Sequence, residues 1–273
     1  GGAGAVLPKG SILSREKYLA IADVDGTRGE IKVFLAEPLT EEEIMTAFSE
    51  QVSTQDEVFW DPRQEAVVAR RVTRFGAIEL TDIRLSSSEE LLTATMIEGI
   101  RLMGIDALPW DKTVKSLRNR SQWLRTQGVV ENDWPDLSEQ HLLETLDAWL
   151  GPYLNGIMRR SQLTKLDLSM MISALFTYSQ LRDLDALAPT HLTVPTGSRI
   201  PVDYSAASQP VLAVRLQEMF GQTETPTVCR GQIKVLLHLL SPARRPVAIT
   251  QDLPSFWKNA YHDVRKDMRG RYP

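Results

Sequence analysis

Short runs of apolar residues separated by turn-forming residues dominate residues 1–86 and predict an antiparallel β unit. The strands are expected at 18–24, 30–36, 57–60, 66–73 and 77–85. Asp25-Gly26 has the composition of a turn between the first two of these strands. Thr40 and Glu43 have the spacing of a capping box, which predicts one short helix before the later strands. This arrangement resembles a small OB-like β-barrel, although any compact meander with one helix has the same pattern.

From residue 87 onward, apolar residues recur at intervals of three and four, which is the helical period. Helices are expected to begin at capping residues and to end at glycines. The predicted caps are Ser87 (paired with Glu90), Asp111 and Ser138, and the predicted ends are Gly104, Gly128 and Gly151. The helical pattern then continues to about Ala188. We therefore predict a helical segment at 87–150 and a second helical part at 151–188.

The remaining residues, 189–273, predict an α+β module. A hairpin is expected around Thr196-Gly197, and two strands are expected on either side of Ser241-Pro242. The run 211–220 is interpreted as an amphipathic helix closed by Gly221, and a final helix is expected to begin near Pro254. The whole chain is thus predicted to be α+β. Its domains are expected to be an OB-like β domain (1–86), a helical segment (87–150) and a C-terminal module (151–273).

Charge is distributed unevenly along this chain. The net charge of all 273 residues is −4, whereas residues 240–273 contain seven Lys or Arg and only three acidic residues. The seven are Arg244, Arg245, Lys258, Arg265, Lys266, Arg269 and Arg271. A basic end on an acidic body indicates either a polyanionic partner or docking on an acidic surface.

The final helix has two different faces. Trp257, Tyr261, Val264 and Met268 form an apolar stripe, and Lys258, His262, Arg265 and Arg269 form a cationic stripe about 100° away. One interpretation is a core-facing stripe beside a solvated face. The other is a surface for single-stranded nucleic acid, in which bases stack on aromatic rings and cations contact phosphates.

A second basic stretch lies in the predicted strand at 66–73 and just beyond it. Arg70 and Arg74 share one face of this strand and Arg71 lies on the other. A basic strand face on an OB-type barrel is a common nucleic-acid surface. The alternative is that acidic residues on neighbouring strands pair with these arginines.

Several kinds of chemistry are missing from the sequence. It has no GxxxxGK[ST] phosphate-binding loop and no GxSxG nucleophile motif, and its four scattered histidines and single cysteine spell no zinc site. We therefore expect no catalytic residue, no metal and no cofactor site here. One cysteine, Cys229, fits a reducing cytoplasm. No apolar run approaches the ~20 residues that cross a bilayer, and no signal peptide is recognised, so no membrane partner is expected.

Long strings in the C-terminal half resemble one helicase family. TGSRIPVDYSAASQPVLAVRLQEMFGQTETP (196–226), HLLSPARRPVAITQDLPSFWKNAY (238–261) and VRKDMRGRYP (264–273) are similar to the C-terminal region of HrpB-type bacterial ATP-dependent RNA helicases of the DEAH-box class. The weaker resemblance of the rest extends over essentially the whole chain. It implies that this sequence is a piece of a larger protein whose two RecA-like motor domains bind ATP and Mg and carry the ATPase motifs.

The resemblance implies an accessory role for this piece. Its expected partners are single-stranded RNA or DNA and the helicase's own motor domains. The predicted nucleic-acid contacts are Arg70, Arg71, Arg74, Arg244, Arg245, Lys258, Arg265, Lys266, Arg269 and Arg271. The alternative is a protein-docking platform that does not contact RNA, which would expose Trp257 and Tyr261 together as one apolar patch. A free-standing enzyme is the least favoured hypothesis.

Overall fold

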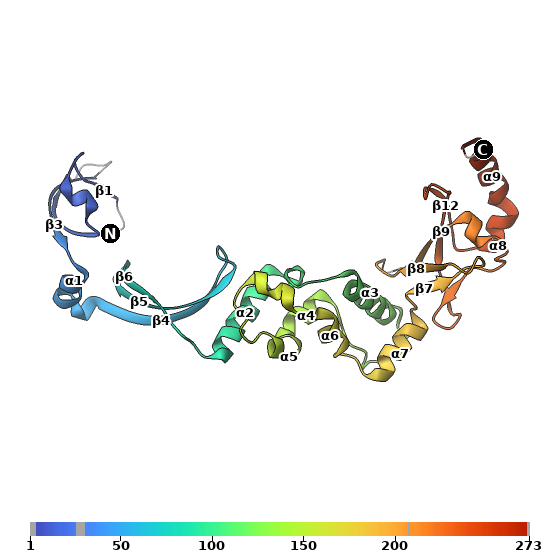
Figure 1. Ribbon diagram of the computed structural model, residues 1–273, viewed down its shortest axis with the longest axis horizontal. Coiled ribbons are helices and arrows are strands. Elements are labelled where there is room, and N and C mark those ends of the chain that lie inside the picture. The colour runs from blue at the N-terminus through green and yellow to red at the C-terminus, as the bar shows by residue number, and fades with distance from the viewer. Residues whose placement is uncertain (1–3, 26–30, 207, 272–273) are drawn as a thin grey trace. The chain divides into compact units, whose positions relative to one another are not determined.

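The computed structural model describes residues 4–25, 31–206 and 208–271, apart from the side chains of 269–271. The chain divides into two compact units, Gly1–Thr95 and Met96–Pro273, and Figure 1 labels many of their helices and strands. The division into three domains at residues 86 and 150 stays a prediction.

The first unit contains two three-stranded sheets. One has the order β1-β3-β2 and the other β4-β5-β6, and helix α1 lies between them in the chain (Figure 1). The elements are β1 (Ala5–Val6), η1 (Ile12–Arg15), β2 (Tyr18–Val24), β3 (Ile31–Leu39), α1 (Glu41–Ala47), η2 (Ser49–Gln51), β4 (Val52–Asp61), β5 (Ala66–Phe75) and β6 (Ile78–Arg84), where η marks a 3₁₀ helix. The turn predicted at Asp25-Gly26 falls partly outside the described residues.

The expected OB-like barrel is not confirmed. Among the described residues, no strand of the first sheet pairs with a strand of the second, so neither sheet closes. The β4–β5 ladder runs without a register shift from Val52↔Phe75 to Asp61↔Ala66. Closing a barrel requires bends, which bulges usually supply, and this long hairpin has none. The strands were predicted in nearly the right places, and 18–24 pairs with the next strand in antiparallel fashion as expected, but the strands form two separate sheets.

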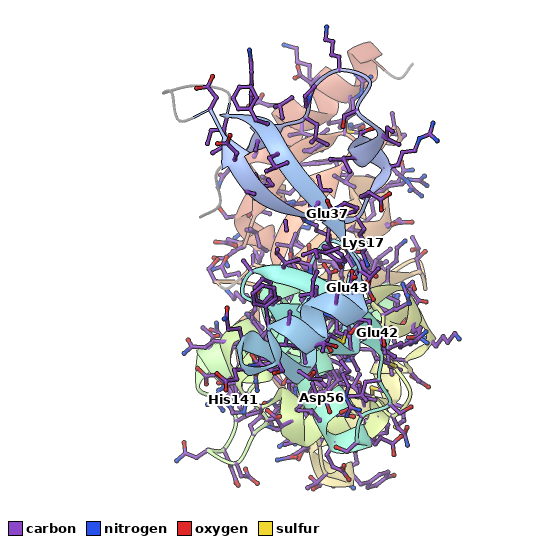
Figure 2. All side chains as sticks on the ribbon, turned by 90° about the vertical axis from the view of Figure 1, so that its left-hand side faces the viewer. Lys17, Glu37, Glu42, Glu43, Asp56 and His141 are labelled. Carbon is purple, nitrogen blue, oxygen red and sulfur yellow. The ribbon has the colours of Figure 1, made fainter. Side chains whose placement is uncertain are left out.

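The capping box at the start of α1 is confirmed. The Thr40 hydroxyl accepts a hydrogen bond from the Glu43 backbone N–H at 3.2 Å, and the Glu43 carboxylate accepts one from the Thr40 N–H at 2.8 Å. The acidic first turn of α1, which includes Glu42 and Glu43 labelled in Figure 2, also forms an ion pair between Glu41 and Lys17. Tyr18 of β2 donates from its hydroxyl to the Glu79 carbonyl at 3.1 Å, which ties the two sheets together.

The second unit begins with helices. They are α2 (Glu89–Met103), which starts in the first unit, η3 (Ile105–Ala107), α3 (Lys112–Gln127), α4 (Glu139–Glu144), α5 (Leu146–Trp149), η4 (Gly151–Tyr153), η5 (Arg160–Lys165), α6 (Leu168–Ser173) and α7 (Tyr178–Leu187). Asp111 and Ser138 cap α3 and α4 as predicted. The cap of α2 is Ser88, whose hydroxyl accepts from the Leu91 N–H, and not Ser87. The single helix expected after Ser138 is instead divided at Thr145.

A five-stranded sheet with the order β13-β12-β9-β8-β7 forms the body of the C-terminal module. The elements are β7 (His191–Thr193), β8 (Arg199–Asp203), β9 (Val211–Arg215), η6 (Leu216–Met219), β10 (Thr227–Val228), β11 (Ile233–Lys234), β12 (Leu236–Leu240) and β13 (Pro246–Thr250). β7 and β8 form the predicted hairpin, in which Gly197 has a φ of 85°. β9 and β12 pair in parallel at the centre of the sheet.

The prediction of a helix over 211–220 is wrong. This run forms strand β9 followed by a 3₁₀ turn. Leu212 and Val214 are fully buried on one face, and Ala213 is exposed on the other. The sequence of a short apolar run is compatible with a strand or a helix. This run forms a strand because it pairs with β8 on one side and with β12 on the other.

The last described elements are α8 (Leu253–Ser255), η7 (Phe256–Ala260), which unlike the other η elements is a π-helical turn, and α9 (Tyr261–Arg271). Asp252 caps α8 by accepting from the Ser255 N–H at 3.0 Å, and Pro254 lies in the first turn as predicted. The side chains of Leu253 and Phe256 are buried, so they fix the beginning of this helical segment to the module.

Candidate nucleic-acid interface

Arg244 and Arg245 lie in the tight turn that joins β12 to β13. The Ser241 N–H donates to the Arg245 carbonyl at 2.8 Å, and the Arg244 N–H donates to the Ser241 carbonyl at 2.9 Å. Arg244 has a φ of 60°, which is unusual for a residue other than glycine. Both arginine side chains are exposed. These hydrogen bonds keep the backbone of the turn compact, and its two arginine side chains are exposed to solvent.

The last helical segment has an aromatic side and a cationic side. The Trp257 indole N–H donates to the Gln222 carbonyl at 2.9 Å, and the Trp257 ring lies 5.1 Å from the Tyr261 ring and 6.0 Å from the Phe220 ring. Trp257 and Tyr261 are both half-buried, whereas Lys258 and Arg265 are exposed. The aromatic stripe thus packs on the module, and the cations face solvent.

The turn and α9 lie side by side. Arg245 and Val247, at the turn and the start of β13, line a cavity of about 170 Å³ with Val264, Asp267 and Met268 of α9. Arg245 is the predicted cation that lines this cavity, and the acidic Asp267 lies there with it. We define the C-terminal cationic surface as Arg244, Arg245, Lys258, Arg265 and Lys266, all exposed.

No ion pair of these five residues is found within the described part of the chain. The side chains of Arg269 and Arg271 lie outside the described residues.

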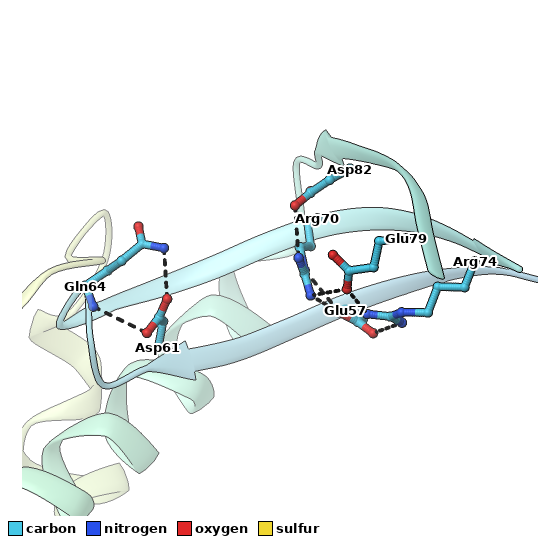
Figure 3. Close-up of polar contacts among 7 residues, drawn as sticks. All are labelled: Glu57, Asp61, Gln64, Arg70, Arg74, Glu79 and Asp82. Carbon is cyan, nitrogen blue, oxygen red and sulfur yellow. Dashed lines mark hydrogen bonds and ion pairs between the residues drawn. The ribbon is translucent and has the colours of Figure 1, made fainter. Parts of the chain in front are cut away.

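The arginines of β5 have a different environment (Figure 3). Arg74 binds Glu57 at 2.5 Å and Glu79 at 2.7 Å. Arg70 binds Glu57 at 3.0 Å and Asp82 at 2.9 Å. These carboxylates raise the pKa of both guanidinium groups, and the hydrogen bond from Arg74 is the main reason that the pKa of Glu57 is lowered.

Arg71 lies on the opposite face and binds Asp56 through Nε at 2.6 Å and through Nη2 at 2.9 Å. These bonds raise the pKa of Arg71 and lower that of Asp56. All three arginines of β5 therefore have carboxylate partners on neighbouring strands, as the alternative interpretation of this strand expected. A phosphate group would have to compete with these carboxylates for the guanidinium groups.

One group of cationic and polar residues was missed by the sequence analysis. Lys112, Lys115 and Asn119 of α3 line a groove together with residues of β9 and β12, such as Ala213 and His238. Because 211–220 was interpreted as a helix, no exposed sheet face was expected beside α3. The helical spacing of Lys112, Lys115 and Asn119 was the available signal, but it carries no information on what α3 packs against.

Two negative findings apply to the described ranges. No group of three or more His, Cys, Asp or Glu side chains is placed there to hold a metal ion. No helix there has the length and apolar character needed to cross a membrane.

Comparison with known proteins identifies the family to which this chain is related. Residues 149–273 match the family model described as "ATP-dependent helicase C-terminal", and residues 51–85 match the model of the connector region of the ATP-dependent RNA helicase HrpB. This chain belongs to the HrpB family, in its C-terminal region. The HrpB resemblance predicted from the sequence is confirmed.

One HrpB sequence and two HrpB crystal structures are also similar to this chain. The chain is 37% identical over 279 aligned positions to the ATP-dependent RNA helicase HrpB of Escherichia coli strain K12, covering 100% of the chain and 34% of that protein. The crystal structure of the E. coli DExH-box NTPase HrpB matches with a TM-score of 0.66 at 35% identity, over 98% of this chain and 34% of that one. A second crystal structure, of the E. coli DEAH/RHA helicase HrpB, matches with a TM-score of 0.61 at 34% identity, over 99% and 34%. The chain thus spans about a third of the length of these HrpB relatives.

Proposed function

We propose that this chain is the accessory C-terminal part of an ATP-dependent RNA helicase and binds single-stranded RNA through its C-terminal cationic surface. ATP and Mg would be bound by motor domains outside this chain, because the sequence has no phosphate-binding loop. The similarity to HrpB helicases supports this assignment. The chain itself would contribute binding and positioning of RNA, with no catalytic residue.

The observation that carries this proposal is the contrast between the two sets of cations. Arg244, Arg245 and Arg265 are exposed without an ion pair among the described residues, whereas Arg70 and Arg74 are bound by carboxylates. Cations that are free to neutralise phosphates release counterions when RNA binds, which gives affinity without sequence preference. We assign the main RNA contact to the C-terminal cationic surface. Contact by the β5 arginines stays a prediction, and it requires displacement of their carboxylate partners.

Fluorescence anisotropy with a labelled single-stranded RNA, across a salt series, tests this proposal. The Lys258→Ala/Arg265→Ala variant is expected to weaken binding and to reduce the slope of log K against log[salt] by about 1.4, from about 0.7 per phosphate contact. The matched control is Lys165→Ala/Arg182→Ala, which removes the same charge from exposed positions elsewhere. A slope that falls equally in both variants would contradict the assigned surface.

Docking on the motor domains is a second candidate function, supported by exposed apolar residues in the first unit. Phe34 is 68% exposed and Leu35 is 61% exposed on β3. Adjacent strand residues point to opposite faces, so both faces of this small sheet have apolar residues in solvent. Trp257 and Tyr261, which a docking platform would expose together, are only half-exposed. We therefore place docking at β3.

The docking proposal is tested by calorimetric titration of this chain with the motor domains of the same protein. Phe34→Ser/Leu35→Ser is expected to abolish that binding and to leave RNA affinity unchanged. Unchanged binding of the motor domains by this variant would contradict docking at β3.

A further inference from the structure

A groove with a volume of about 540 Å³ lies between α3 and the five-stranded sheet. Such a volume is within the range of about 300–1,000 Å³ that is typical of small-molecule and nucleotide sites. One wall is the face of α3 that carries Lys112, Lys115, Ser116 and Asn119. These residues are three, four and seven positions apart, so they lie within one stripe of the helix. A helix usually turns an apolar stripe toward a sheet, and this polar stripe indicates a solvent-filled groove.

The other wall is the outer face of the sheet. Ala213 of β9 and His238 of β12 are paired directly across the two parallel strands, and both line the groove. Asp203 of β8 is paired with Val211 of β9, and both line it as well. Ala213 is exposed and Val211 is half-buried. Val211, Ala213 and the His238 ring therefore give this wall a surface on which a planar base can lie.

The charges of the groove favour an anionic occupant. Lys112 and Lys115 are exposed and form no ion pair among the described residues, and Asp203 is the one acidic residue of the lining. The Asp203 carboxylate already accepts a hydrogen bond from the Ser205 N–H at 2.8 Å. Arg215 lies on the same face of β9 as Ala213, two residues further along the strand. Positive charge thus exceeds negative charge around the groove.

The polar side chains of the groove are suited to a nucleobase. The Asn119 amide offers both a donor and an acceptor, the Ser116 hydroxyl offers either, and the Asp203 carboxylate is an acceptor. Bases of single-stranded RNA are read by hydrogen bonds to their edges while their faces stack on protein. The Ser116 and Asn119 side chains on α3 and the sheet wall opposite them, which also carries Asp203, together provide both.

We propose that this groove binds one nucleotide of single-stranded RNA, with its phosphate on Lys112 and Lys115 and its base between Asn119 and the Ala213–His238 surface. The proposal rests on the proposed RNA-binding function and adds a second contact to it. His238 precedes Arg244 by six residues in the chain, which places the groove and the C-terminal cationic surface within about 22 Å. One RNA strand can therefore contact both.

Two variants separate the phosphate contact from the base contact, in anisotropy titrations of the whole chain with single-stranded RNA. Lys112→Ala/Lys115→Ala is expected to weaken binding about tenfold or more and to reduce the salt slope by about 1.4. Ala213→Leu fills the groove without changing charge. It is expected to weaken binding by about fivefold or more, the cost of one lost base contact, with an unchanged salt slope.

The matched controls are Lys165→Ala/Arg182→Ala for charge and Ala186→Leu for an exposed alanine, and thermal unfolding of each variant confirms that it folds. A strand that contains 4-thiouridine is further expected to crosslink to 112–119 or 211–213. If both groove variants bind RNA like wild type while Lys258→Ala/Arg265→Ala does not, the groove proposal is overturned and the proposed function stands. If the groove variants lose only binding of the motor domains, the groove is a protein-docking site and the proposal is overturned. If wild type binds no RNA, both are overturned.

Discussion

The Arg120 side chain connects α3 to the end of α7. We expect its replacement by methionine to lower the stability of the second unit. The Arg120 side chain is buried, with 5% of its surface exposed. Its Nε–H donates to the Ala188 carbonyl at 2.5 Å, and its Nη2 pairs with the Asp185 carboxylate. Ala188 is fully buried, so its carbonyl would lose this donor without gaining water. Methionine keeps the volume of the stem and removes both interactions.

The expected loss follows from these two contacts. A hydrogen bond from a charged donor contributes about 1.5–3 kcal/mol. The ion pair adds about 0–1 kcal/mol, since the Asp185 side chain is 75% exposed. Arg120→Met should therefore reduce the free energy of unfolding by about 2–4 kcal/mol. For a unit of this size each kcal/mol lowers the midpoint temperature by about 2–4 °C, so the midpoint should fall by about 4–16 °C.

Thermal unfolding followed by tryptophan fluorescence measures this change, because five of the six tryptophans lie in the second unit. Asp185→Asn is the matched control, and it should cost less than about 1 kcal/mol because the carboxylate is solvated. A loss below about 0.5 kcal/mol in Arg120→Met would refute the reasoning. An equal loss in the two variants would show that the ion pair, and not the bond to Ala188, holds the two helices.

Three further predictions concern single positions. The lowered pKa of Glu57 means that its ion pairs stabilise the first unit above its ordinary pKa of 4.5 and that this contribution is lost as pH falls below it. The urea concentration at the midpoint of unfolding should therefore fall between about pH 6 and about pH 3, and it should fall less in the Glu57→Gln variant. An identical fall in wild type and variant would count against this role of Glu57. Asp111→Ala should destabilise α3 by about 1 kcal/mol in urea unfolding, with Asp111→Asn close to wild type; equal loss in both would contradict the capping role. Burial raises the pKa of the Cys229 thiol, so iodoacetamide should alkylate it at neutral pH only on unfolding, and rapid labelling of the native chain would disprove this.

Local features of the fold were predictable from the sequence because they depend on neighbouring residues. The caps at Thr40, Asp111 and Ser138 follow from side chains within three residues of the helix start. The strand at 211–215 was not predictable, because its identity depends on pairing with β8 and β12. The same limit applies to the barrel, whose closure would require pairing between strands far apart in the chain.

The candidate site was predictable as a set of charges but not as an environment. Arg70 lies directly opposite Glu57 across the β4–β5 ladder, and Arg71 lies opposite Asp56. A shift of one residue in this register would place Arg70 opposite Asp56 but Arg71 opposite Gln55, and the sequence does not fix the register. The Arg244–Arg245 turn and α9 were each identified as basic, but their placement around one cavity follows only from the fold. The groove beside α3 depends on the same sheet.

The central claim is that this chain binds single-stranded RNA through exposed cations, and its most direct test is the affinity at two salt concentrations. Anisotropy of a labelled RNA would be measured with the wild-type chain at 50 mM and at 200 mM salt. If three to five of the cations of the C-terminal cationic surface contact phosphates, the affinity should fall by about 20- to 130-fold over this range. Absence of binding at 50 mM, or an affinity that does not change with salt, would contradict the account.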